Sequence, residues 1–140
     1  MSQKNVEFVK SRLSGAADMD KHTLLAALPQ LIAQACDPDV EWVEDAQRAD
    51  GQVYRGHEGV KHAFERWLEQ WDEYGYEAER YADCDDDVLV SARERGTGMT
   101  SGASVSSRIF AVYTIRAGKI ARYREFYDEK VALEAVGFAG

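Results

Sequence analysis

The chain has 140 residues, of which 45% are hydrophobic and 30% are charged, and its net charge is −8. This length suits one domain, residues 1–140, with a core large enough to fold without disulfides or metals. The negative charge and the lack of a basic patch argue against nucleic acid and against anionic membranes as partners.

The sequence carries no targeting or cross-linking signal. Cys36 and Cys84 are its two cysteines, and neither belongs to a C-x-x-C pair, so two reduced thiols are expected. The N-terminus lacks the apolar run of a signal peptide, and no stretch approaches the ~20 apolar residues of a membrane span. We therefore predict a cytoplasmic protein.

The first half of the chain has the apolar spacing of helices. A helix is expected over residues 5–13, ending at Ser14-Gly15, and a second over residues 21–35, where Pro29 should kink or divide it. After a short strand at residues 40–43, a strongly amphipathic stretch predicts a third helix over residues 59–72.

Near Gly75 the apolar period changes from the 3.6 of a helix to the 2 of a strand. Four strands are expected, at residues 76–82, 88–95, 105–115 and 119–127, with a hairpin loop at residues 96–102. Asp128 can cap a short C-terminal helix. Helices followed by an antiparallel meander predict an α+β fold with the helices on one face of the sheet, and the third helix packed against the meander.

The longest predicted strand is apolar on both faces. One face carries Ile109, Ala111, Tyr113 and Ile115, and the other carries Phe110 and Val112. Helices on one side of the sheet would leave the second face exposed. We therefore predict a homodimer that buries the face with Phe110 and Val112.

Glu125 is the first candidate for chemistry. It alternates with Tyr123 and Tyr127 along the last strand, so the three side chains should share one face. A carboxylate on an apolar face must be paired or protonated, and such a setting suits a general acid or base. The alternative is a purely structural ion pair with an arginine on a neighbouring strand.

Several aromatic residues are candidates for the wall of a ligand pocket or, alternatively, for the core. They are Trp42, Tyr54, Phe64, Trp67, Trp71, Tyr113, Tyr123 and Tyr127. Glu44, two residues beyond Trp42, is either a second pocket acid or a solvent-facing one. His57 and His62 do not share a helix face, so no metal site is expected.

Three stretches in order carry a family resemblance: DPDVEW at residues 37–42, YRGHEGV at 54–60, and GKIARYREFYD at 118–128, followed by ALEAVG at 132–137. Together they resemble the SnoaL-like polyketide cyclase and ketosteroid isomerase-like group of the nuclear transport factor 2-like superfamily. The resemblance implies a curved antiparallel sheet wrapped around N-terminal helices as a cone, also described as cystatin-like, with a short C-terminal helix. It also implies an apolar pocket, a homodimer through the open sheet face, and neither metal nor organic cofactor.

The resemblance also suggests roles for single residues. Glu125 matches the catalytic aspartate on the last strand of the cyclases and of the limonene-type epoxide hydrolases. Arg93 matches the arginine that lies between two aspartates in those hydrolases, and Arg95 replaces the second aspartate. Ala111 stands where many of the cyclases have a histidine. Arg93 and Arg95 are therefore expected either beside Glu125 or at a solvated strand end.

These observations favour a protein that binds a small apolar molecule, polyketide- or steroid-like, in an internal pocket. Cofactor-free acid–base chemistry of the cyclase or isomerase type, with Glu125 moving the proton, is the leading hypothesis. The alternative is a ligand-binding or scaffold domain without turnover. Epoxide hydrolysis is disfavoured, because Arg95 stands in place of the second carboxylate.

Overall fold

The computed structural model describes residues 2–17, 19–45, 51–98 and 104–137. Within them the chain forms α1 (Ser2–Ala17), α2 (Lys21–Ala35), β1 (Cys36–Val43), β2 (Val53–Arg55), α3 (Gly56–Leu68), β3 (Trp71–Cys84), β4 (Asp87–Gly98), β5 (Ser104–Arg116), β6 (Lys119–Phe126) and α4 (Glu129–Ala135). The predicted α+β class and the short C-terminal helix are confirmed. Most of the predicted loop at residues 96–102 lies outside the described residues.

The first helix is longer than the sequence predicts, and the second has the predicted bounds but is not divided. α1 runs through Gly15, and α2 runs through Pro29 without being divided. Asp20 starts α2 as its N-cap, because its carboxylate accepts a hydrogen bond from the Thr23 amide at 2.7 Å. Within the described ranges, no helix is long and apolar enough to cross a membrane.

The six strands form one curved sheet in the order β2-β1-β6-β5-β4-β3. Strands β3 to β6 pair as the predicted antiparallel meander. The sheet as a whole is mixed rather than antiparallel, because β1 pairs with β6 in the parallel sense, with Trp42 opposite Tyr123. This pairing brings the end of the helical half of the chain beside the last strand.

The boundary between α3 and β3 differs from the prediction. The helix ends at Leu68, and Trp71 and Gly75 both lie within β3. Trp71 continues the apolar spacing of the helix, but its ring packs against Gly96 of β4, so close that a Cβ on Gly96 would lie 2.5 Å from Trp71 Cε3. α3 contacts β1 and α2 more extensively than it contacts the meander.

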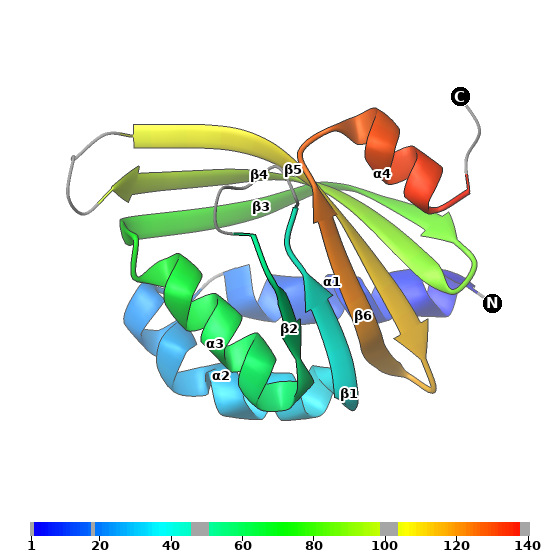
Figure 1. The fold of residues 1–140 in the computed structure, drawn as a ribbon, viewed down its shortest axis with the longest axis horizontal. Coiled ribbons are helices and arrows are strands. Elements are labelled where there is room, and N and C mark those ends of the chain that lie inside the picture. Colours follow the sequence, from blue (N-terminus) through cyan, green and yellow to red (C-terminus); the bar gives the residue numbers. More distant parts are fainter. Residues whose placement is uncertain (1, 18, 46–50, 99–103, 138–140) are drawn as a thin grey trace.

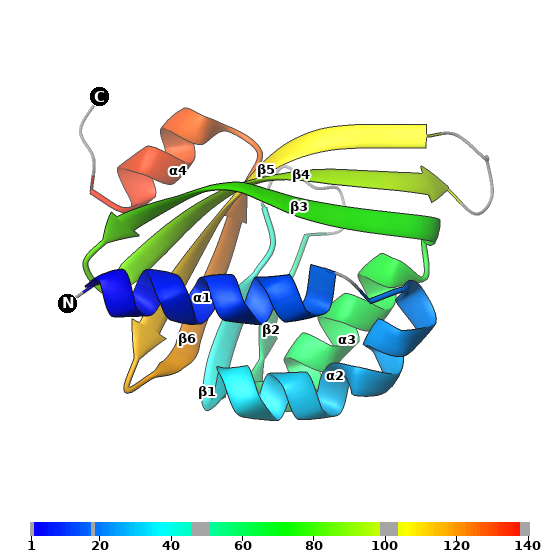
Figure 2. The ribbon, with the colours of Figure 1, turned by 180° about the vertical axis from the view of Figure 1, so that it is seen from behind.

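The main core lies between the concave face of the sheet and helices α1 to α3. Figures 1 and 2 show these three helices on one side of the bent sheet and α4 on the other. Val90, Ala92, Ile109 and Ala111 of the meander are at most 1% exposed and pack toward Val9 of α1 and its neighbours. Strand alternation thus determines which side chains lie on the concave face, and the residues of β5 on this face are the predicted ones.

The opposite, convex face has its own small core beneath α4. Val112 and Ala132 are fully buried, and Leu89 and Phe110 are 4% and 5% exposed. The reason given above for a homodimer is therefore wrong, because the chain covers Phe110 and Val112 with its own C-terminal helix. The helix is capped by Asp128, whose carboxylate accepts a hydrogen bond from the Lys130 amide at 2.9 Å.

Candidate functional site

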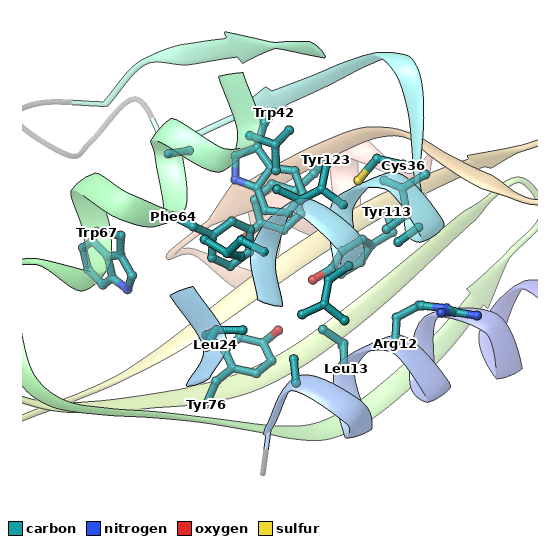
Figure 3. A pocket seen from close by; sticks show the side chains of 18 of the residues that line it. Arg12, Leu13, Leu24, Cys36, Trp42, Phe64, Trp67, Tyr76, Tyr113 and Tyr123 are labelled. Atoms are coloured by element: carbon teal, nitrogen blue, oxygen red, sulfur yellow. The ribbon is translucent and has the colours of Figure 1, made fainter. Parts of the chain in front are cut away.

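A cavity of about 210 Å³ lies between the concave face and the three helices. Its apolar lining comes from α1, α2 and α3, and the strands contribute aromatic and acidic side chains. Figure 3 shows the rings of Trp42, Tyr123 and Tyr113 along this space, with Tyr113 next to Tyr123 and Tyr76 farther from the Trp42–Tyr123 pair. A concave, mostly apolar space with a few polar groups has the character of a small-molecule site.

The ring of Trp42 stacks on the ring of Tyr123, with centroids 3.8 Å apart and an angle of 17° between the planes. The stack follows directly from the parallel pairing of β1 and β6, which sets these two residues opposite each other. Phe64 of α3 and Tyr113 of β5 flank the stack at 5.4 Å and 5.1 Å. These four rings make an aromatic wall in which only the Trp42–Tyr123 pair is stacked, because Phe64 is tilted by 49° and Tyr113 by 62° to the ring it contacts.

Glu125 lies on the same face as Tyr123, as the alternation predicts, and it lines the cavity. The residue is 7% exposed, and the Tyr123 hydroxyl donates a long hydrogen bond to Glu125 Oε2 at 3.4 Å. Its partner across the β5–β6 pair is Ala111, which carries no polar side chain. A carboxylate with this degree of burial and one phenol beside it can accept or release a proton within the cavity.

Arg93 and Arg95 do not accompany Glu125. Val90 and Ala92 of β4 lie in the core on the concave face, and Glu94 lines the cavity, so the odd-numbered residues between and after them point to the opposite face. Arg93 Nε lies 3.8 Å from Glu79 Oε2, and Arg93 Nη1 donates to Ser106 Oγ at 3.3 Å. Arg95 is exposed and borders only a small hollow beside Trp71. Neither arginine therefore lies beside Glu125, and Arg95 has the solvated position that the sequence left open as the alternative.

Glu94, between the two arginines, is the acid that β4 directs into the cavity. It accepts a hydrogen bond from the Tyr74 hydroxyl of β3. Burial raises the pKa of Tyr74 well above its ordinary value, and the Glu94 carboxylate raises it further, so Tyr74 stays protonated. The sequence carries a signal for Glu94, because Val88, Val90 and Ala92 precede it with the strand period of two.

Glu44 is a third acid on the cavity wall and is 8% exposed. The residue just before β2 binds its carboxylate: the Gln52 amide donates a hydrogen bond to Glu44 Oε1 at 3.1 Å. The neighbouring Asp45 has a structural contact, since its Oδ2 accepts from the Tyr127 amide at 2.7 Å. The pocket alternative for Glu44 thus agrees with its position better than the solvent-facing one.

The predicted aromatic wall is partly correct. Trp42, Phe64, Trp67, Tyr113 and Tyr123 line the cavity, whereas Tyr54, Trp71 and Tyr127 do not. Tyr54 is buried elsewhere and accepts a hydrogen bond from Arg66 Nη1 at 2.6 Å. Two rings on the wall, Tyr74 and Tyr76 of β3, were not predicted, although they alternate at the start of the meander.

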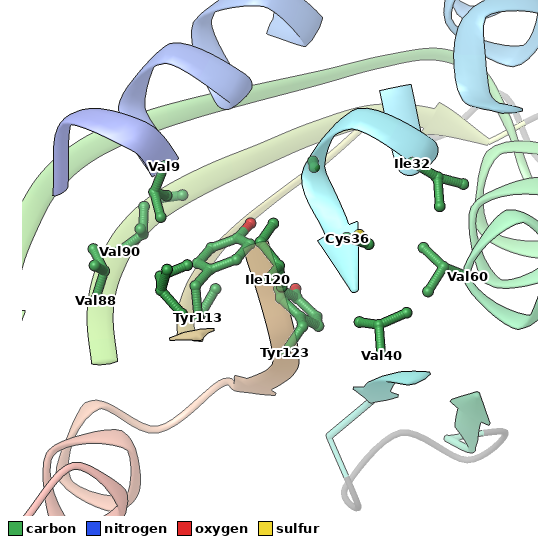
Figure 4. Packing of buried hydrophobic residues seen from close by; sticks show 14 of the residues in the cluster. Val9, Ile32, Cys36, Val40, Val60, Val88, Val90, Tyr113, Ile120 and Tyr123 are labelled. Carbon is green, nitrogen blue, oxygen red and sulfur yellow. The ribbon is translucent and has the colours of Figure 1, made fainter. Parts of the chain in front are cut away.

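The cavity offers neither a metal site nor an activated thiol among the described residues. No group of three histidine, cysteine or acidic side chains comes together in those ranges. The His57 ring is bonded instead to the Cys36 carbonyl, at 2.9 Å. Burial raises the pKa of the Cys36 thiol to about 11, so it remains protonated near neutral pH. Figure 4 shows its sulfur in the apolar cluster near Val40 and Val60.

Residues 22–123 match the family model of the SnoaL-like domain. The chain belongs to the SnoaL-like domain family. No curated protein matches the sequence. The matched stretch contains Trp42, Glu94 and Tyr123, and it ends two residues before Glu125, so the case for Glu125 in this SnoaL-like domain depends on its geometry.

Solved structures confirm the nuclear transport factor 2-like fold. An NTF2-like protein from Burkholderia thailandensis is 27% identical, with a TM-score of 0.73 over 93% of this chain and 95% of that chain. A candidate SnoaL-like polyketide cyclase from Jannaschia sp. CCS1 is 20% identical, with a TM-score of 0.72 over 99% and 94%. A protein of ketosteroid isomerase-like fold from Catenulispora acidiphila, solved in complex with trimethylamine, is 14% identical, with a TM-score of 0.67 over 95% and 94%.

Proposed function

We propose that this SnoaL-like domain binds a small, flat, apolar molecule in its cavity and that Glu125 exchanges a proton with it. The observation that carries this proposal is the position of the Glu125 carboxylate. It is buried on the cavity wall, directly beside the stack of Trp42 on Tyr123. A ring held against that stack would lie close to this carboxylate, which is the type of group that serves as a general base.

The size of the cavity narrows the ligand class. A cavity of roughly 150 Å³ in another protein accommodates benzene, and the volume here is about 210 Å³. One or two fused rings therefore suit the enclosed part better than a four-ring steroid. Larger polyketide-like molecules would have to extend past Arg12 and Leu13 of α1, which stand on the lining.

The chemistry that fits one buried carboxylate is proton transfer at a carbon next to a carbonyl group. Glu125 takes the proton from that carbon, the electron pair moves onto the carbonyl oxygen as an enolate, and the proton returns to the same or another carbon. The net result is exchange or isomerisation, and no redox partner is needed. Tyr123 holds the carboxylate in place through its hydroxyl.

A second candidate function is ligand binding without turnover. It is favoured by Ala111, which lies opposite Glu125 and provides no side chain to pass a proton onward. Both candidates share the same pocket and differ only in whether a proton leaves the ligand.

Proton exchange distinguishes the two candidates directly. A thermal-shift screen of one- and two-ring aromatic ketones would identify binders, and NMR in D₂O would then follow loss of the hydrogens next to the carbonyl. We expect faster exchange with the wild-type protein and no acceleration with Glu125→Gln, while both proteins bind the ketone. Binding without accelerated exchange by the wild type would support the non-catalytic candidate.

A matched control tests whether the loss of exchange is specific to a carboxylate in the cavity. Glu58→Gln makes the same chemical change on the exposed first turn of α3 and should leave exchange unaltered. If Glu125→Gln accelerates exchange as well as the wild type does, Glu125 is not the base. If no small aromatic ketone binds at all, the ligand class is wrong.

We also propose a homodimer, formed through the part of the convex face that α4 leaves open. This part carries a charged cluster in which Arg108 Nη2 lies 3.2 Å from Glu79 Oε1 and Arg93 approaches the same carboxylate. Sedimentation should give twice the 15.7 kDa chain mass at micromolar concentration. Arg108→Glu should then weaken the dimer, and a wild-type monomer would contradict the proposal.

A further inference from the structure

The Tyr76 hydroxyl is a buried polar group without a hydrogen-bond partner of normal geometry among the described residues. Tyr76 extends from β3 onto the cavity lining, and Figure 3 shows its hydroxyl and that of Tyr113 directed toward each other across the inner part of the cavity. Buried hydroxyls in folded proteins nearly always have a partner, so an exception that faces a cavity calls for one.

A hydrogen bond between Tyr76 and Tyr113 cannot use the protons of both hydroxyls. The two hydroxyls are close enough to influence each other's ionisation. Each hydroxyl brings one proton, and a hydrogen bond between them would use only one of the two. One O–H donor therefore remains directed at the cavity, whichever phenol acts as the acceptor, because the described residues supply no other partner to either hydroxyl.

We infer that Tyr76 and Tyr113 form the polar anchor of the ligand and donate a hydrogen bond to an oxygen of the molecule that occupies the cavity. This inference rests on the proposed function and deepens it, since it specifies a feature of the ligand. The Tyr113 ring packs edge-on against Tyr123 of the stack, with centroids 5.1 Å apart, and the Tyr76 hydroxyl is directed toward that of Tyr113. An oxygen-bearing ring could thus lie on the stack and reach the phenols with its oxygen.

The electrostatics of the cavity indicate a neutral acceptor. Burial raises the pKa of both phenols, so they donate and do not ionise near neutral pH, and the Glu125 carboxylate adds to the rise for Tyr76. The acids Glu94 and Glu125 share the same concave wall and would repel a carboxylate or a phosphate. A ketone, quinone or ether oxygen is therefore the expected class of acceptor.

The experiment compares two probes of one shape, α-tetralone, which has a carbonyl oxygen, and tetralin, which lacks it. Titrations that follow the fluorescence of the cavity tryptophans Trp42 and Trp67 would give the two affinities. For the wild type we expect α-tetralone to bind about fivefold more tightly than tetralin. The double variant Tyr76→Phe/Tyr113→Phe should bring this ratio to about one, mainly by weakening α-tetralone, and the single variants would apportion the effect.

Tyr81→Phe provides the matched control, because Tyr81 lies on the same strand but not on the cavity lining. It should keep the wild-type ratio. Tyr76→Phe alone should change the melting temperature little, because among the described residues the Tyr76 hydroxyl has no hydrogen-bond partner of normal geometry.

The possible failures are distinguishable. If the wild type binds both probes equally, or if the double variant keeps the preference for α-tetralone, the anchor is wrong while the pocket still binds flat ligands. A clear fall in the melting temperature of Tyr76→Phe would also count against the anchor, because it would reveal a partner within the protein. If neither probe binds the wild type, the proposed function fails and the anchor fails with it.

Discussion

The Tyr74 hydroxyl of β3 donates a hydrogen bond to the Glu94 carboxylate of β4, two residues along the neighbouring strand from the position that faces Tyr74. Hydrogen bonds to charged acceptors contribute about 1.5–3 kcal/mol to stability, roughly twice the contribution of neutral ones. Since this one joins two partly buried groups on the cavity wall, it should stabilise the rim of the site as well as hold Glu94 in place.

We therefore predict that Tyr74→Phe lowers the free energy of unfolding by about 1.5–3 kcal/mol. Tyr76→Phe, the same change two residues along the strand, should lower it little or raise it, because Tyr76 loses no hydrogen bond of normal geometry. Urea unfolding of both variants tests the pair. Equal destabilisation by the two changes would contradict the distinction between Tyr74, which is hydrogen-bonded to Glu94, and Tyr76, which has no hydrogen bond of normal geometry.

Gly96 should not tolerate a side chain. A Cβ there would lie 2.5 Å from Trp71 Cε3 and 2.9 Å from Cδ2, and Trp67 packs edge-on against Trp71 at 5.5 Å and restricts its escape. Gly96→Ala is expected to destabilise the protein by about 1–3 kcal/mol. Gly75→Ala is the control, since a Cβ on Gly75 meets no atom within 4 Å. A near-wild-type unfolding curve for Gly96→Ala would show that Trp71 can move aside.

Cys36 should make the protein less stable in alkali. Its pKa rises from an ordinary 9.0 to about 11 on folding, through burial. The unfolded chain therefore loses this proton first, so the stabilisation present below pH 9 is lost as the pH rises toward 11. Two pKa units correspond to about 2 kcal/mol at pH 11. Denaturant unfolding between pH 8 and 11 should show a weaker decline for Cys36→Ala than for the wild type, and parallel declines would refute the effect.

The C-terminal helix should be essential to the convex core. Ala132 is fully buried against Leu89, Phe110 and Val112, so Ala132→Asp places a carboxylate among apolar groups and should cost about 3 kcal/mol or more. Val131→Asp lies on the same helix with 44% of the residue exposed and should be nearly neutral. If both changes have equally small effects on thermal unfolding, α4 does not contribute a stable part of the fold.

The features predicted best from sequence are those set by strand alternation within one element. Tyr123 and Glu125 share the concave face, and Phe110 and Val112 lie on the convex one, because neighbouring side chains on a strand must point to opposite sides. Arg93 lies one position along β4 from Glu94, which is the residue that lines the cavity. The family resemblance points Arg93 toward Glu125, whereas the alternation of Val88, Val90 and Ala92 points it to the opposite face, and a shift of one position exchanges the two faces of a strand.

Other differences depend on contacts between distant elements. The apolar spacing of the sequence fits Trp71 to the helical stripe of α3 as well as to a strand. Its packing on Gly96 belongs to its place in β3. The covering of Phe110 by α4 is likewise a tertiary contact, since a helix of seven residues carries no sign of which surface it meets. The parallel pairing of β1 with β6 joins segments about eighty residues apart, and no local pattern indicates it.

That parallel pairing also sets the order in which the molecule can be assembled. Each hairpin of the meander closes between neighbours in the chain, whereas β1 pairs with β6 across about eighty residues, with Cys36 opposite Ile120. Closing so long a loop carries an entropic cost that local pairs avoid. During synthesis the ring stack of Trp42 on Tyr123 therefore cannot form until Tyr123 has left the ribosome, long after Trp42, and we expect the ligand wall to form late in folding.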